Sequence, residues 1–97
     1  MKVSIPLEPF NTMVKNGSAA MKMQQIMGDM KPEAVYFAEM DGKRTGIFIV
    51  NLEDPSKVPS LAEPWFLTFN GDVRFHVVMS PEDLGNAGLD ELGKKWG

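Results

Sequence analysis

The sequence contains no cysteine and a single histidine, His76. Without cysteine there is no disulfide and no thiolate metal site, which suits a reducing compartment. No stretch approaches the roughly 18 consecutive apolar residues that a membrane-spanning helix needs. The first residues also lack the apolar core of a signal peptide and reach a proline at Pro6. We therefore expect a cytoplasmic protein with no membrane partner.

An excess of basic charge is also missing. Ten Lys and Arg residues stand against 13 Asp and Glu residues, and the net charge is −3. Because phosphate contacts dominate affinity for nucleic acid, we expect no nucleic-acid partner. No Gly-rich phosphate loop and no nucleophile elbow is present. The sequence predicts no bound cofactor.

What is present is a chain of 97 residues, 43% of them hydrophobic, which is typical of one globular domain. Such a chain buries only about 60–65% of its unfolded surface when it folds alone, so association with a second copy is a common source of stability. We expect an α+β domain over residues 1–80, with residues 81–97 as a helical extension of the same domain.

The hydrophobic periodicity predicts the individual elements. Alternating apolar residues indicate strands, and apolar residues spaced by three and four indicate helices. The predicted strands cover 2–7, 33–40, 44–52 and 73–79. The predicted helices cover 9–15, 18–30 and 58–69, followed by two short ones at 81–87 and 89–95.

The clearest local signal is Asp41-Gly42 between two β-prone runs, which predicts a two-residue hairpin loop. This loop sets the register and places Glu39 opposite Arg44, where an ion pair would contribute a few tenths of a kcal/mol. Residues 46–50 are apolar on both faces of their strand, so we expect both faces to be covered.

The order strand, helix, strand, strand, helix, strand predicts a ferredoxin-like βαββαβ fold. Its four antiparallel strands form one sheet, with both helices on one face. The other face is then bare, and a second subunit is the economical cover. We therefore expect a homodimer in which two sheets meet face to face.

Four segments support this interpretation by resemblance: 31–37, 41–44, 62–66 and 77–84. They resemble segments of short bacterial proteins in the dimeric α/β-barrel superfamily, and the element order agrees from Lys2 to Met79. The superfamily includes small monooxygenases and haem-degrading oxygenases that bind substrates inside the barrel. The resemblance implies a barrel dimer but no particular reaction, because one fold hosts many functions.

Strand parity places a set of polar side chains on the face that would line the barrel interior. We predict a partly polar pocket there for an aromatic or carboxylated ligand, with Arg74 as the partner of the anion. The opposite side of the last strand should pack on the helices through Val73, Phe75 and Val77. The candidate pocket residues are Ser4, Tyr36, Thr45, Arg74 and His76.

Three functional classes stay open at this stage. The first is a barrel that binds a small molecule, the second a cofactor-independent monooxygenase or isomerase, and the third an inert interaction dimer. A metal site is disfavoured because His76 stands alone. The four methionines between Met21 and Met30 favour flexible packing over copper binding. Trp65 and His76 match residue types of the haem-degrading members, but on the wrong elements.

The C-terminal segment carries Trp96, and an exposed tryptophan usually has a partner. We expect residues 89–96 to dock on the neighbouring subunit or to cap the mouth of the barrel.

Overall fold

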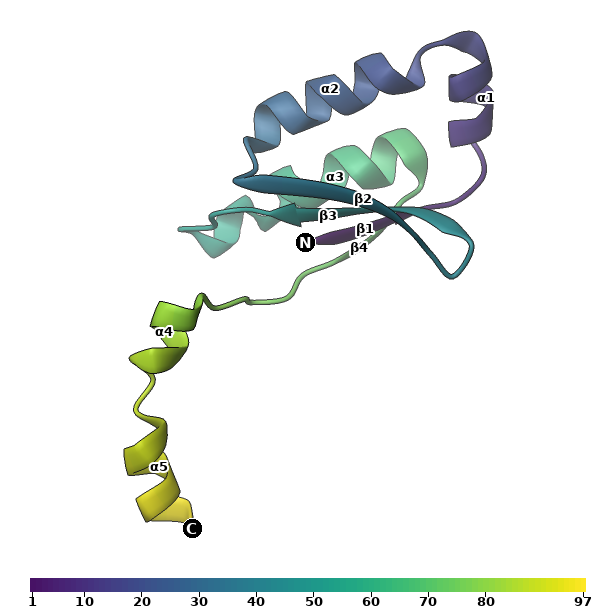
Figure 1. The fold of residues 1–97 in the computed structure, drawn as a ribbon. Coiled ribbons are helices and arrows are strands. Elements are labelled where there is room, and N and C mark those ends of the chain that lie inside the picture. The colour runs from purple at the N-terminus through teal and green to yellow at the C-terminus, as the bar shows by residue number, and fades with distance from the viewer.

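The computed structural model describes all residues, 1–97, and shows an α+β fold with one four-stranded antiparallel sheet. The strand order is β2-β3-β1-β4. Helices α1, α2 and α3 lie on one face of this sheet, and the opposite face, here called the bare face, carries no helix (Figure 1). No helix combines the length and apolar character needed to cross a bilayer. The elements are β1 (Lys2–Ile5), α1 (Phe10–Asn16), α2 (Ala19–Met30), β2 (Ala34–Met40), β3 (Lys43–Ile49), the 3-10 turn η1 (Pro55–Lys57), α3 (Val58–Phe69), β4 (Asp72–Arg74), α4 (Pro81–Gly85) and α5 (Leu89–Trp96).

The β2–β3 hairpin confirms the turn and the register that the sequence predicts. Asp41 and Gly42 have φ values of 56° and 76°, the left-handed pair that a two-residue hairpin loop requires. Glu39 does lie opposite Arg44. The predicted ion pair is nevertheless wrong, because the Glu39 carboxylate accepts a hydrogen bond from the Gly42 N–H instead. The turn N–H is the local partner, and Arg44 is left free to bond elsewhere.

The core lies between the sheet and the helices, and aromatic rings form its centre. Phe48, Trp65 and Phe69 are fully buried. The Trp65 ring lies 5.2 Å from Phe48 and 5.9 Å from Phe69, measured between centroids. The Trp65 indole N–H donates to the sulfur of Met30 at 3.3 Å, so this buried donor is satisfied. Phe66, which follows Trp65 in α3, is 40% exposed.

The fourth strand is shorter than the alternation predicts. It pairs with β1 from Asp72 to Arg74, where Arg74 lies opposite Lys2. Because β1 begins at Lys2, strand residues beyond Arg74 have almost no partner left. The expectation that Phe75 and Val77 pack on the helices is therefore wrong, since they are 40% and 99% exposed.

Residues 75–97, here called the C-terminal arm, extend away from the sheet and helices (Figure 1). Every residue of the arm is exposed. The radius of gyration is 17.2 Å, whereas a compact chain of this length has about 12.5 Å. The arm contains α4, which begins with a capping box formed by Ser80 and Asp83, and α5. The chain thus consists of a compact body and an exposed arm.

Candidate functional site

The strand register brings four of the predicted pocket residues onto the bare face. Ser4 lies opposite Thr45, Arg74 opposite Lys2, and Tyr36 opposite Ile47, which also faces Lys2. Directly opposed residues share a face of the sheet. Tyr36 is 65% exposed, while the side chain of Thr45 is buried and donates to the Lys43 carbonyl. His76 lies beyond the end of β4 and is exposed.

Arg74 is already engaged by a carboxylate. Its Nε and Nη2 atoms donate to the two oxygens of Asp72 at 3.0 and 3.2 Å. These hydrogen bonds hold the pKa of the Asp72 carboxyl below its ordinary value, and the positive charges of Lys43 and Lys2 act in the same direction. An anion bound at Arg74 would have to compete with Asp72.

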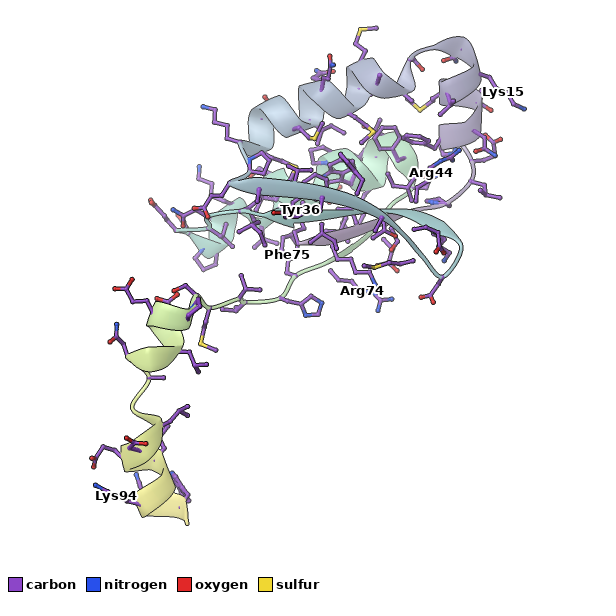
Figure 2. The ribbon with its side chains drawn as sticks, viewed as in Figure 1. Lys15, Tyr36, Arg44, Arg74, Phe75 and Lys94 are labelled. Atoms are coloured by element: carbon purple, nitrogen blue, oxygen red, sulfur yellow. The ribbon has the colours of Figure 1, made fainter.

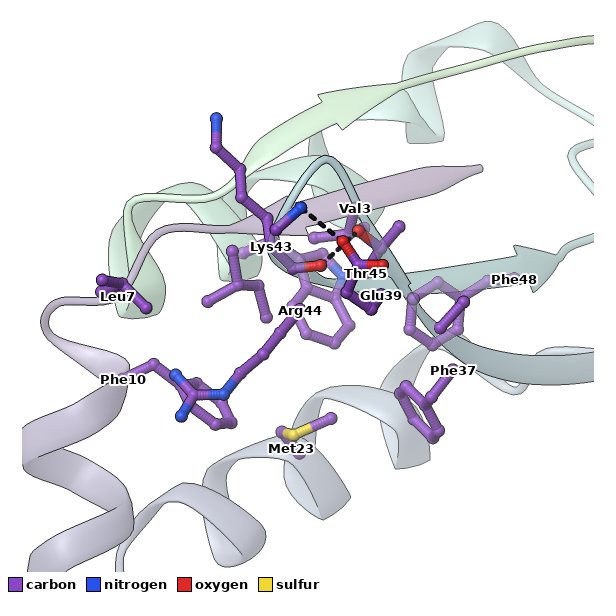
Figure 3. A pocket seen from close by; sticks show the side chains of 15 residues that line it. Val3, Leu7, Phe10, Met23, Phe37, Glu39, Lys43, Arg44, Thr45 and Phe48 are labelled. Carbon is purple, nitrogen blue, oxygen red and sulfur yellow. Dashed lines mark hydrogen bonds between the residues drawn. The ribbon is translucent and has the colours of Figure 1, made fainter.

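A pocket that the sequence did not predict lies on the other side of the sheet, between β1–β3 and the helices. Its volume is about 580 Å³ (Figure 3). Of the predicted site residues, Thr45 is among its lining residues. The walls are mainly apolar side chains from both layers, which include Val3, Ile5, Leu7, Phe10, Met23, Phe37, Phe48 and Trp65.

Arg44 supplies the positive charge of this pocket. Figure 2 shows Arg44 on the helix side of the sheet and Arg74 on the bare face. Its Nη1 atom donates to the side-chain oxygen of Asn11 at 2.7 Å. Its guanidinium carbon lies 4.9 Å from the centroid of the Phe10 ring, a cation–π contact.

No carboxylate pairs with Arg44. The ion pairs of the structure are Arg74–Asp72 and Lys94–Glu91. Glu39 caps the hairpin turn through Gly42, and Glu8 accepts hydrogen bonds from Thr12. A guanidinium has five N–H donors, so Arg44 keeps donors that an anionic ligand can use.

The pocket depends on a glycine in its floor. A Cβ atom on Gly46 would lie 2.6 Å from Cε2 of Phe48, so only glycine leaves room for this ring. Phe37 meets Phe48 edge to face, with centroids 6.1 Å apart. Phe37 itself is 59% exposed. The pocket therefore has a rigid aromatic floor and one exposed aromatic wall.

A second, smaller cavity of about 280 Å³ lies where the arm leaves the body, and His76 is the one polar residue in its lining. No group of three or more His, Cys, Asp or Glu side chains is placed to hold a metal ion. Comparison with known protein families, curated sequences and solved structures gives no match.

Proposed function

We propose that this protein binds a small apolar carboxylate in the pocket between the helices and the sheet. The carboxylate pairs with Arg44, and the hydrocarbon part lies along the aromatic and aliphatic walls. The observation that carries this proposal is an arginine without a carboxylate partner beside an apolar cavity of about 580 Å³. Ligand sites typically occupy 300–1,000 Å³ and combine apolar walls with a few orienting polar groups.

The chemistry of the pocket lining favours some classes of ligand over others. A planar guanidinium matches a carboxylate through two parallel hydrogen bonds. The apolar walls disfavour sugars and nucleotides, whose polar groups would lose hydrogen bonds on burial. Met23 has a flexible side chain that adapts to ligands of different shape.

Binding is favoured over catalysis by the state of the pocket's other polar groups. Glu39 and Thr45 are both engaged in hydrogen bonds within the hairpin. A cofactor-independent monooxygenase or isomerase, the alternative that the resemblance suggests, needs a group poised to move a proton. The remaining charged groups of the lining are two cations, Lys43 and Arg44.

Calorimetric titration with octanoate tests the proposal, with octanamide as the uncharged control ligand. We expect octanoate to bind more tightly, and Arg44→Gln to weaken octanoate about 10- to 100-fold, the range for hydrogen bonds to a charged group. Arg74→Gln is the matched control and should leave octanoate affinity unchanged. Equal affinity for both ligands, or an equal loss in both variants, would overturn the assignment to Arg44.

We also propose that the body has the ferredoxin-like arrangement and belongs to a homodimer of the α/β-barrel type. The strand order β2-β3-β1-β4, with α1, α2 and α3 on one face, supports this arrangement. In such a dimer the bare face with Tyr36, Thr45 and Arg74 becomes the barrel interior. That interior is a second candidate ligand site, supported by the shared face of these residues, and loss of octanoate binding in Arg74→Gln would favour it. The cytoplasmic location stays a prediction.

A further inference from the structure

The C-terminal arm carries exposed apolar side chains along its whole length. Those of Phe75, Val77 and Val78 border the small cavity beside the end of β3. Soluble monomers rarely expose apolar patches of this extent, and larger ones mark interaction surfaces. The exposed fractions run from 40% to 99%. The side chains are Phe75, Val77, Val78, Met79, Leu84, Leu89, Leu92 and Trp96.

Helix α5 has the pattern of a docking helix. Leu89, Leu92 and Trp96 recur at i, i+3 and i+7 and share one face, while charged residues occupy the rest of the surface. An isolated helix of eight residues is marginal in water, because nucleation costs more than so few hydrogen bonds return. Packing of its apolar face on another surface is the ordinary source of stability for such a helix.

The bare face of the sheet has the complementary properties. Its centre is apolar, with Tyr36, Ile47 and Ile49 on neighbouring strands. Its charged residues are three cations and one anion, namely Lys2, Lys43, Arg74 and Asp72, so its net charge is +2.

Charge complements shape in this pairing. Residues 81–97 contain four acidic residues and two lysines, so the helical part of the arm has a net charge of −2. An arm laid on a bare face brings opposite charges together, and in a barrel dimer it would offset the repulsion between two faces of net charge +2. The arm therefore complements the bare face in charge.

We propose that the C-terminal arm of each chain docks on the bare sheet face of a second copy of the chain. Because both surfaces belong to one chain, a two-fold axis satisfies both arms and both faces at once. The connector Phe75–Ser80 begins at the small cavity beside the end of β3, and the arm then extends away from its own sheet (Figure 1). A stable interface uses about 20–30 residues on each side, and residues 75–97 match that size.

The test uses the full-length chain and two variants that remove opposite halves of the contact. Trp96→Ser alters the arm, and Ile47→Lys alters the bare face. Light scattering should give about 21.6 kDa for the wild type, twice the 10.8 kDa of one chain. Each variant alone should raise the dimer dissociation constant at least tenfold. Leu67→Ser is the matched control, since Leu67 is 80% exposed on α3, outside both surfaces.

Mixing the two variants gives the decisive result. The mixed pair keeps one intact contact, from the normal arm of Ile47→Lys to the normal face of Trp96→Ser, so the mixture should dimerise more tightly than either variant alone. Circular dichroism confirms that each variant is folded. Two results would overturn the proposal: a mixture no tighter than its components, or a wild-type monomer whose radius of gyration shows the arm folded onto its own sheet.

Discussion

Gly46→Ala tests whether the ring of Phe48 is fixed above the backbone of β3. The added Cβ would lie 2.6 Å from Cε2 and 2.8 Å from Cζ of that ring, whereas carbon atoms in good contact are about 3.5–4.0 Å apart. The ring would therefore have to move by roughly 1 Å. It has little room, because Phe48 is fully buried between Phe37 and Trp65.

The magnitude follows from two opposing effects. Overpacking of a well-packed core costs about 1–3 kcal/mol, and replacing glycine by alanine within an element returns about 0.5–1 kcal/mol. The midpoints of these ranges leave a net loss of unfolding free energy of about 1.3 kcal/mol, which lowers the melting temperature of a domain of this size by about 5–10 °C.

Gly28→Ala is the matched control, because the same methyl group meets nothing within 4 Å there. It lies inside α2, where alanine is preferred to glycine by about 1 kcal/mol, so this variant should melt higher than the wild type. Both are measured by thermal circular dichroism at one protein concentration. A Gly46→Ala protein as stable as the wild type would refute the reasoning about Phe48.

Three further outcomes follow from local contacts. Arg74→Gln should raise the pKa of Asp72 toward its ordinary value, since the Arg74 hydrogen bonds lower it. In the wild type the Asp72 carboxylate stabilises the fold at pH values above its pKa in the unfolded chain. That stabilisation is lost as the pH falls through the lowered pKa of the folded state. An NMR titration of Asp72 that is unchanged in the variant would contradict the role of Arg74. Asp54→Ala removes the acceptor of the Ser56 N–H and should lower the midpoint of urea unfolding, while an unchanged midpoint would argue against this cap. Ser80→Ala should reduce the helical NMR shifts of α4, and shifts equal to the wild type would show that the capping box is dispensable.

The sequence predicts the elements well where local chemistry decides them. Asp41-Gly42 determines both the turn and the pairing of β2 with β3, because a left-handed pair of residues allows only that loop. The stripe ending in Trp65 and Phe69 predicts α3 and most of its buried face. Local periodicity is sufficient in these places.

The wrong predictions occur where segments distant in the sequence determine the structure. The length of β4 depends on where β1 begins, and alternation within residues 73–79 carries no information on that partner. Arg44 lies on the same face of β3 as Gly46 and Phe48, so the alternation of side chains puts its charge on the helix side of the sheet. The predicted ion pair between Glu39 and Arg44 does not form, because the Glu39 carboxylate has a closer donor in the Gly42 N–H of the turn. The pocket requires Phe10 and Asn11 of α1 to lie beside Arg44. These residues are distant in the sequence, so local patterns do not predict it.

The length of the connector Phe75–Ser80 has a consequence for the size of the assemblies that the chain can form. Six extended residues reach about 20 Å, which limits how far an arm can cross before it meets an acceptor. Because each chain carries both an arm and an acceptor face, a closed dimer forms only if each of two chains binds the arm of the other. An arm that binds without reciprocation leaves one free arm and one free face at the ends, and further copies can add there. A connector too short for the return crossing would therefore convert a closed pair into an open filament.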